Sequence, residues 1–550
     1  MAFLNNEVLD DPILADGQVS FNGGMASNTK AALLAQDQAQ ELRNVALDRR
    51  GRGNSRAGFH YLHYTAGSLD GGAYFDTPSV EQMVVAANGA LLHLVPSGDQ
   101  DTAAYTETAI SGYTYTEGNP VSMAQLVDKL YLADGSQRLY EWDGTTLKQV
   151  VTGSGTNSTN PLVAGAKYLV SHTWRLFASG VSTAPDTVYV SDFLAGAEWA
   201  AASFRVGGGE GQAITAIHPW HDYFLAVFKE ASVYVVNCTP LTTAGAPTDP
   251  DGTLETAMFP IQLVNGTTGC VSHRTVAQVG FDLFFLARDG VRSLQRSASE
   301  LQFGVSEPIS APIQDYIDRI NWNAIGQASA TFYKGRYVIS LPLDSDTTPQ
   351  YTFSYNLLTQ SWEGYWDLNG PKLWVQTRFS SLDRLNAFAD AGYITRWREH
   401  VPESSRTAAD YMDEDVYEGG GDYSARGLGS RVLTRAYNFN EVLNAKTGFI
   451  CEIEFEDQGF ATTLVVEYAL DASTPLTLAT ESISSGVILP VTLPITFPSP
   501  RFRKLCLNLQ QLGSFRELAL RVSTTEGPLL LRSVSVTAFP DTMNTRYGFS

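Results

Sequence analysis

The sequence predicts a mainly β protein: a β-propeller of about six to eight blades, with an N-terminal extended arm before it and a C-terminal β-sandwich after it. Three observations lead to this fold class. Similar pairs of short apolar runs recur along residues 61–400, and turn residues such as Asp-Gly and Asn-Gly separate the runs. Alternation of apolar and polar residues returns in residues 431–550 after an interruption.

The repeated unit is clearest in LYLADGSQRLYEW, residues 130–142, where two strand-like runs flank a polar turn. The second runs of successive units follow one another at intervals of 41 to 61 residues, a ragged period that is typical of propeller blades. The related stretches are Val84–Leu94, Leu130–Trp142, Leu176–Asp192, Phe224–Val236, Phe284–Leu294, Tyr337–Asn356 and Asn386–Trp397.

A single hairpin of this kind is marginally stable by itself, so several hairpins must stack on one another. Radial stacking leaves only short, protected sheet edges, which favours a propeller over residues 61–400. A β-sandwich or a long antiparallel array is the alternative. Because the recurring hairpins need not all become complete blades, the blade number stays open.

Residues 1–60 differ from the blades in composition. They contain a polar lead, a stretch of moderate helical character from Thr29 to Leu47, and the basic cluster RRGRGNSR. Terminal segments are ordered only when something ties them down, and arginines beside glycines suit contact with an acidic neighbouring subunit. We therefore predict an N-terminal assembly arm that is not needed to close the propeller, with binding of a phosphate backbone as the alternative for the basic cluster. The candidate arm residues are Gly23, Gly24, Gln38, Asn44, Arg49, Arg50, Arg52 and Arg56.

Residues 401–430 are rich in Gly, Ser and acidic residues and lack hydrophobic periodicity, which predicts an acidic, glycine-rich linker or loop. Its carboxylates could ligate Ca²⁺, but they lack the order of an EF-hand loop, so a solvated loop is the preferred interpretation and calcium binding stays open. Residues 431–550 predict a separate accessory β-sandwich. The acidic residues of the loop are Asp410, Asp413, Glu414, Asp415, Glu418 and Asp422.

Composition excludes several classes of protein. With 44% hydrophobic and 11% aromatic residues the chain can bury sizeable cores. Its formal net charge of −21 argues against a general phosphate-gripping surface, so contact with DNA should not be adhesive.

The start resembles no secretory signal and no apolar run is long enough to span a membrane, which predicts assembly in a cytoplasm without a membrane partner. The four cysteines lack zinc-type spacing and are interpreted as buried thiols.

No stretch carries recognisable chemistry, so we predict no enzyme activity, no cofactor and no metal. His60 and His63 lie three residues apart and would point to opposite faces of a strand, which is not the spacing of a metal pair. The sequence contains no nucleophile-elbow or zinc-protease motif. The alternative function is a carbohydrate-binding or carbohydrate-active propeller in which Trp220, Trp362 and Trp366 stack on sugars, although blade packing is the preferred interpretation of these side chains.

Short motifs across residues 20–400 resemble the tail nozzle or packaged-DNA-stabilisation (tail tubular) proteins of short-tailed bacteriophages. The lead segment has the family's Gly-Gly pair, then a Gln, an Asn and an Arg-x-Gly, although Ala57 stands where the family usually has Pro. Residues 172–199 are similar to the family's Arg-Leu-Phe strand followed by a Val-Tyr-x-Ser-Asp strand and a closing Trp, and residues 333–366 to another of its blades. The C-terminal sandwich is less recognisable.

The resemblance implies a structural virion protein. Several copies, six in the family, would form a ring below the portal and adaptor proteins, with tail fibre or tail tip proteins as further partners. Double-stranded DNA would pass through the channel without specific binding, during both retention and ejection. The location implied is the tail of the virion, after assembly in the host cytoplasm.

Overall fold

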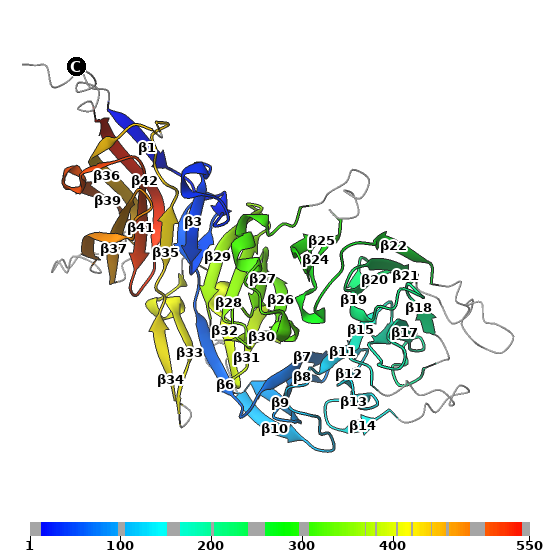
Figure 1. The fold of residues 1–550 in the computed structure, drawn as a ribbon. Helices are drawn as coiled ribbons and strands as arrows, with labels where there is room; N and C mark the ends of the chain where they lie inside the picture. The colour runs from blue at the N-terminus through cyan, green and yellow to red at the C-terminus, as the bar shows by residue number, and fades with distance from the viewer. Residues whose placement is uncertain are drawn as a thin grey trace, which may run out of the picture.

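The computed structural model describes residues 13–96, 105–150, 165–199, 203–239, 259–295, 307–368, 370–379, 382–402, 405–419, 422–441, 443–457, 461–483 and 501–541. Within them the protein is mainly β, and its strands form a ring of small sheets beside a pair of larger sheets (Figure 1).

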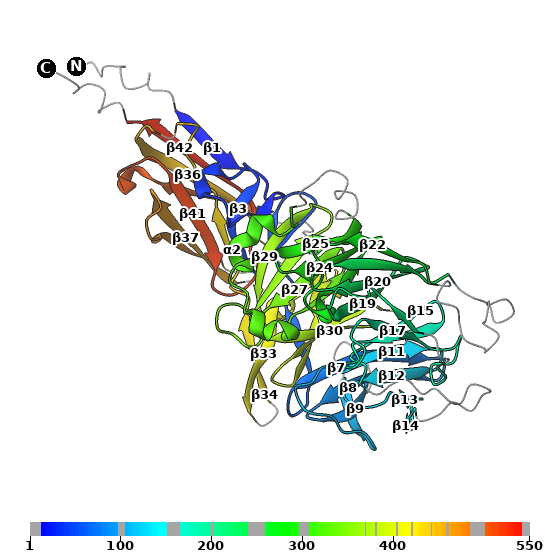
Figure 2. The same ribbon diagram turned by 45° about the vertical axis from the view of Figure 1, so that its right-hand side comes forward.

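Six small sheets lie in the ring, the arrangement of a β-propeller (Figure 2). In each sheet one edge strand, called its first strand, is innermost and touches the first strand or the entry turn of a neighbouring sheet. The first three sheets contain β7 (Leu69–Thr77), β8 (Val80–Ala87), β9 (Ala90–Pro96), β10 (Tyr105–Ile110); β11 (Ser122–Leu126), β12 (Lys129–Ala133), β13 (Tyr140–Trp142), β14 (Leu147–Gln149); β15 (Tyr168–His172), β16 (Arg175–Ser179), β17 (Thr187–Val190) and β18 (Ser203–Arg205). The other three contain β19 (Ile214–Trp220), β20 (Phe224–Lys229), β21 (Val233–Asn237), β22 (Ile261–Asn265); β23 (Ala277–Val279), β24 (Asp282–Ala287), β25 (Gly290–Ser293); and β30 (Pro371–Thr377), β31 (Arg384–Ala389), β32 (Tyr393–Trp397) with β6 (Phe59–Tyr64).

A further four-stranded unit completes the ring between the sheets of β23 and β30, because β26 contacts both of those strands. The predicted propeller of about six to eight blades is therefore confirmed. The unit also continues outward as one end of a larger, ten-stranded sheet. Its strands are β26 (Ser329–Tyr333), β27 (Arg336–Leu341), β28 (Tyr351–Asn356) and β29 (Ser361–Asp367).

The repeated hairpin of the sequence forms as predicted in the unit of β12 and β13, where Leu130 pairs with Trp142. Asp134 holds the turn, because its carboxylate accepts hydrogen bonds from the backbone N–H groups of Ser136 and Gln137 at 2.8 and 2.9 Å. These bonds lower the pKa of Asp134 although its burial acts in the opposite direction. Polar turn residues thus set the hairpin before the apolar runs pack.

The ring closes with β6, a strand from the very start of the propeller region. β6 pairs antiparallel with β32, so that Phe59 lies opposite Trp397. The rings of Phe59, Trp366, Trp374 and Trp397 pack in one buried cluster at this seam. This blade takes its strands from two distant parts of the chain. Opening the ring at this blade would therefore disrupt the buried aromatic cluster.

The second body is a β-sandwich of two sheets that use both ends of the chain. In one sheet β36 and β42 pair with each other; in the other β41 pairs with β37 and β35. Cys451, Ile453 and Val534 from the first sheet share a core with Leu464, Val466 and Val522 from the second. The strands are β1 (Leu14–Gln18), β2 (Gly24–Met25), β3 (Gln38–Arg43), β4 (Val45–Leu47), β5 (Gly53–Ser55), β35 (Arg431–Thr434), β36 (Lys446–Asp457), β37 (Thr462–Leu470), β38 (Leu476–Ile483), β39 (Arg501–Asn508), β40 (Ser514–Phe515), β41 (Leu518–Thr524) and β42 (Leu530–Pro540).

The N-terminal segment differs from the predicted one. Thr29–Leu47 is not helical apart from one short turn, because β3 and β4 occupy its second half. β1 pairs with β42, and β3 lies between β29 of the propeller and β35 of the sandwich. Within the described residues, the segment is thus built into the sandwich rather than standing apart as an arm.

The acidic stretch 401–430 is also more ordered than a linker. It contains the hairpin of β33 (Met412–Gly419) and β34 (Asp422–Gly427), which lies against β6 (Figure 1). A strand is predicted from the alternation of apolar and polar residues. Two register shifts in the pairing of β33 with β34 interrupt this alternation, which explains why no strand was predicted here.

Helices are few and short in the described residues. The α-helix α2 (Gln314–Ile317) follows a 3₁₀ turn and covers the sheet of β26–β29. The 3₁₀ turns are η2 (Ala31–Leu33), η4 (His273–Thr275), η5 (Ala311–Ile313), η6 (Trp322–Gln327), η8 (Arg398–His400), η10 (Ala408–Tyr411) and η11 (Gln510–Leu512).

The cysteines follow the prediction in part. All four are free thiols, and Cys238, Cys270 and Cys451 are buried. Burial raises the pKa of Cys270 to about 11 and that of Cys238 and Cys451 to about 12, so these thiols stay protonated and packed. Cys506 is exposed on β39, where the prediction of a buried thiol was wrong.

Candidate functional site: the junction and the axial cavity

The propeller and the sandwich meet along β3, which pairs in parallel with β29 and antiparallel with β35. Two glycines permit this approach. Both have positive φ, and a Cβ at Gly24 would overlap the carbonyl oxygen of Trp362, while one at Gly364 would overlap that of Leu42. β3 pairs with β35 over several residues and with β29 at one pair, Arg43 with Tyr365, so the two bodies share one sheet at the junction.

Asn44 follows β3 and binds both bodies through its backbone and its amide. It has a φ of +54°, and it is 3% exposed. Its backbone N–H donates to the carbonyl oxygen of Tyr365 at 2.9 Å, and its amide donates to that of Gly429 at 3.2 Å. Its side-chain oxygen accepts from the N–H of Asp367 and from Arg56 Nε at 3.0 and 3.2 Å.

Arg56 and Asp413 form an ion pair inside the same junction, and both side chains are fully buried. Arg56 Nη1 and Nη2 donate to the two carboxylate oxygens at 2.9 and 2.5 Å. The carboxylate also accepts from the N–H of Phe59 at 3.1 Å, at the start of the strand that closes the propeller. A buried bidentate pair with further hydrogen bonds fixes geometry, since neither charge can be left alone without a large desolvation penalty.

The remaining candidate residues of the predicted arm have different environments. Gly23 donates its N–H to the Asp37 carbonyl, and Gln38 accepts from Ala35 N–H. Arg52 bridges Asp48 and Glu456 at 2.5 and 2.7 Å, so it is committed within the sandwich. The two candidates that remain exposed are Arg49 and Arg50, in the turn between β4 and β5. Gly24, Asn44 and Arg56, which the sequence singled out as residues of an assembly arm, thus lie at the junction between the two bodies.

The acidic residues that were candidates for Ca²⁺ are engaged with protein groups wherever their side chains are described. Asp410 accepts from Arg398 at 2.6 Å and caps η10 through Thr407. Glu414 accepts from the backbone of Tyr61 at 3.0 Å. The side chains of Asp415, Glu418 and Asp422 lie outside the described residues. No group of three or more His, Cys, Asp or Glu side chains suited to a metal is found in the part of the chain that is described.

His60 and His63 lie on β6 and do not come together. His63 Nε2 lies 2.8 Å from a Glu107 oxygen, and His60 Nδ1 lies 3.8 Å from Glu414. Each histidine joins β6 to a neighbouring element.

The three tryptophans of the carbohydrate hypothesis are mostly interior. Trp362 is 1% exposed and Trp366 is fully buried, so both pack against blade neighbours. Trp220 is partly buried, and its indole N–H donates to the carbonyl oxygen of Phe281 at 3.1 Å. A stacking platform for a sugar would therefore be limited to Trp220 and its neighbours.

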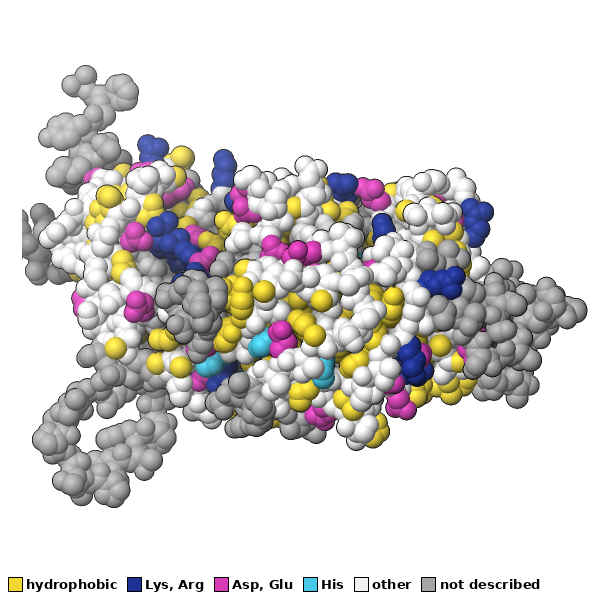
Figure 3. Space-filling view, turned by 90° about the horizontal axis from the view of Figure 1, so that it is seen from below, with side chains coloured by type: hydrophobic (Ala, Val, Ile, Leu, Met, Phe, Trp, Pro, Cys, Tyr) yellow, Lys and Arg dark blue, Asp and Glu magenta, His cyan; other side chains and the backbone are white. Residues whose placement is uncertain are grey.

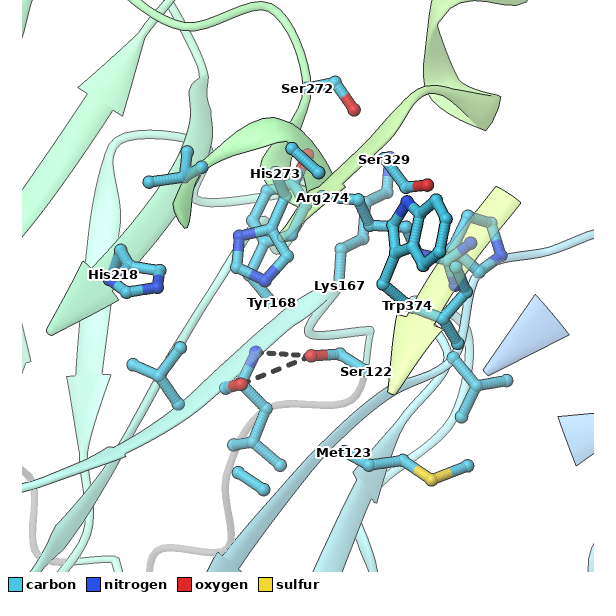
Figure 4. Close-up of a pocket in the computed structure, with 18 of the residues that line it drawn as sticks. Ser122, Met123, Lys167, Tyr168, His218, Ser272, His273, Arg274, Ser329 and Trp374 are labelled. Carbon is cyan, nitrogen blue, oxygen red and sulfur yellow. Dashed lines mark hydrogen bonds between the residues drawn. The ribbon is translucent and has the colours of Figure 1, made fainter. Parts of the chain in front are cut away.

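An axial cavity of about 610 Å³ lies where the innermost strands converge (Figure 4). Its walls come from β11, β15, β19, β26 and β30, together with the segment that contains η4. This volume is in the range of small-molecule sites. The cavity was not found from the sequence, since its residues belong to different blades and share no local motif. The charged and imidazole side chains in its lining are Lys167, His218, His273 and Arg274.

One rim of the propeller is apolar. The turn between the first and second strands carries an exposed large hydrophobic side chain in five blades, and the exposed fraction is 48% or more in each. The first strands lie side by side around the axis, so these turns share one face of the ring. The five residues are Val127, Trp174, Tyr223, Phe281 and Leu382.

Charged side chains of both signs are interspersed over the face seen from below, and Lys and Arg do not gather there into a belt (Figure 3). Among the described residues, no helix is long and apolar enough to cross a membrane.

No family model matches the chain, and no curated protein matches it. Among solved structures, a crystal structure of the computationally designed Ika8 protein aligns at 11% sequence identity with a TM-score of 0.35, over 62% of this chain and 99% of the designed chain.

Proposed function

We propose that this chain is a structural virion protein of a short-tailed bacteriophage: a ring-forming nozzle or connector subunit of the tail, below the portal and adaptor proteins. The junction is the observation that carries the proposal. Gly24, Asn44 and Arg56, which carry part of the family resemblance, are the residues that join propeller to sandwich. A tail part that holds packaged DNA must transmit load without hinging, and strand pairing on both sides of β3 supports such a role.

The DNA channel of this proposal lies between subunits and not within one propeller. A cavity of about 610 Å³ has the size of a small-molecule site, which is too small for a duplex. Each subunit carries a formal charge of −21, so a ring of copies presents a repulsive field to DNA. Weak attraction favours sliding, because every phosphate paired with Lys or Arg strengthens retention.

The apolar rim supports the platform part of the proposal. Exposed apolar side chains that cluster on one face of a protein are typical of contact surfaces. We assign Val127, Trp174, Tyr223, Phe281 and Leu382 to contacts with a neighbouring copy or with another tail protein. The rival function, a carbohydrate-binding propeller, is favoured by one observation on the same rim: Trp220, His221 and Phe281 lie together, and the His221 and Phe281 rings stack at 6.0 Å.

Electron microscopy of the purified full chain tests the proposal, first alone and then with the adaptor protein of the same virus. The expected result is a closed ring of subunits with a central opening, formed alone or on the adaptor. A chain that stays monomeric with the adaptor at micromolar concentration would overturn it. A glycan array in parallel tests the rival, since retention of a polysaccharide that a Trp220→Ala substitution abolishes would favour sugar binding.

A further inference from the structure

The axial cavity has an unusual charge balance for this protein. The chain has 58 acidic and 37 basic residues, yet no Asp or Glu is among the residues that line the cavity. The lining includes the cations Lys167 and Arg274 and the imidazoles of His218 and His273. The axial cavity of this acidic protein is therefore lined by positively charged side chains and by hydrogen-bonding imidazoles.

Arg274 is positioned by backbone and not by a carboxylate. Its Nη2 donates to the carbonyl oxygen of Asp70. The carboxylate of Asp70 is committed elsewhere: it accepts from Tyr115 Oη at 3.0 Å, Gly118 N–H at 2.9 Å and Lys372 Nζ at 3.3 Å. Burial lowers the pKa of Arg274 to about 10, and the nearby Asp70 charge only partly opposes this. The guanidinium therefore stays charged at neutral pH but is poorly compensated.

Lys167 adds a second charge from the start of β15. Its stem lies along Gly135, where a Cβ would approach the Lys167 side chain at 2.9 Å. No described residue forms an ion pair with it. A cation at the mouth of a confined space attracts anions more strongly than one on an open surface, because low-dielectric walls focus its field.

The two imidazoles face the same space (Figure 4). Burial lowers the pKa of His218, and burial with His218 and Arg274 nearby lowers the pKa of His273 to about 3. His273 Nδ1 is buried without a hydrogen-bond partner in the described structure. Both rings are neutral at pH 7, so an entering anion would meet polar groups without any repelling charge.

The walls are apolar enough to hold more than an inorganic ion. Tyr168, Leu373 and Trp374 line the cavity beside the polar groups, and Trp374 is 8% exposed. A site with apolar walls and a few convergent polar groups binds organic ligands of limited size. We propose that the axial cavity binds a small organic anion, a carboxylate or a phosphate monoester, whose charged oxygens lie between Lys167 and Arg274 and whose apolar part lies against Tyr168 and Trp374.

This inference is independent of the tail proposal, since it concerns the inside of one propeller. Isothermal titration of the full chain with phenyl phosphate and with benzoate tests it, and benzyl alcohol serves as the neutral probe of similar size. We expect at least one anion to bind with a Kd of about 1 mM or tighter, while the alcohol does not bind. The two anions distinguish the phosphate from the carboxylate source.

Two substitutions connect binding to the cavity. Lys167→Gln should weaken anion binding by about tenfold, which is the effect of removing one charge-assisted hydrogen bond. The matched control Lys334→Gln removes the same charge from the exposed turn between β26 and β27 and should leave binding unchanged. Unchanged thermal unfolding of both variants shows that they fold. The proposal is overturned if neither anion binds below about 10 mM, or if Lys167→Gln binds like the unmodified chain.

Discussion

Arg56 and Asp413 stand 357 positions apart in the sequence and form a fully buried, bidentate ion pair where the propeller closes on the sandwich. The pair connects the segment just before β6, the strand that closes the propeller, to the hairpin β33–β34, which sequence patterns predicted as a loop. Its position makes the N-terminal segment, the closing blade and the acidic region one cooperative unit.

Removing one member of this pair should strongly destabilise the chain. We expect Arg56→Ala or Asp413→Ala to lower the free energy of unfolding by about 3–5 kcal/mol, because the fully buried charge that remains loses its bidentate partner. Urea denaturation followed by tryptophan fluorescence measures it. The control Arg205→Ala breaks a pair in which Arg205 is 68% exposed, and should change stability by less than about 1 kcal/mol. Equal effects of the buried and exposed substitutions would contradict this prediction.

Gly364 should tolerate no side chain, since it lets β3 approach β29. Its φ is +93°, and a Cβ would overlap the carbonyl oxygen of Leu42. Gly335 is the matched control, because its φ is also positive, +80°, but a Cβ there meets nothing within 4 Å. Backbone strain alone should cost about 1–2 kcal/mol in either Gly→Ala variant. We expect Gly364→Ala to lose at least about 2 kcal/mol more than Gly335→Ala, and comparable losses would show that β3 is not held so closely.

Lowering the pH should reduce the stability of the propeller through a group at its axis before the carboxylates become protonated. His273 has its pKa lowered from 6.5 to about 3, chiefly by burial, with His218 and Arg274 adding to the effect. Between these two pH values the unfolded chain binds a proton that the folded chain does not, so stability falls as the pH drops from 6.5 towards 3. Urea midpoints measured between about pH 7 and pH 5 should decline less steeply in His273→Gln than in the unmodified chain. Parallel declines would contradict this assignment.

The hairpins could be predicted from the sequence because their information is local. In residues 130–142 the turn residues and both strands lie within one short window, and Leu130 pairs with Trp142 as expected. The prediction of helical character for Thr29–Leu47 was wrong for the opposite reason. Its moderate helical character is a weak preference, and pairing of β3 with β29 and β35, both more than 300 residues away, outweighs it.

The site residues also divide into those that the sequence singled out and those that it could not. Gly24, Asn44 and Arg56 could be singled out by family resemblance, but Asp413, the long-range partner of Arg56, lies in a stretch predicted as a solvated acidic loop. Lys167 and Arg274 could not be singled out at all, since each lies in a separate part of the chain and only the closed ring brings them to one cavity. Burial of Trp362 and Trp366 agrees with the preferred interpretation of these residues as blade packing.

The apolar rim should matter for assembly and not for folding. Trp174 and Phe281 are 61% and 78% exposed, so replacing both with Ser removes little buried surface. We expect the double variant to keep its thermal unfolding temperature and to weaken association with itself or with the adaptor by about tenfold or more, as loss of aromatic contact residues does. Leu443→Ser is the control, because Leu443 is 84% exposed but lies on the sandwich. Mass photometry over a dilution series measures the change. Equal assembly of the rim variant and the control would exclude this surface as an interface.

The exposed arginines of the N-terminal segment separate contact with DNA from contact between subunits. Arg49 and Arg50 lie in the turn between β4 and β5, and the chain around them is strongly acidic overall, at −21. If they face a neighbouring acidic copy, the isolated chain should bind duplex DNA with a Kd of about 10⁻⁴ M or weaker at physiological salt, and Arg49→Ala with Arg50→Ala should leave that value unchanged. The same double variant should assemble less well than the unmodified chain. The difference in assembly between the two should shrink as the salt concentration rises, because salt screens the charged contact. Fluorescence anisotropy with a labelled duplex and mass photometry across a salt series measure the two effects. A sub-micromolar, salt-sensitive affinity for DNA that the double variant loses would place these arginines on the DNA instead.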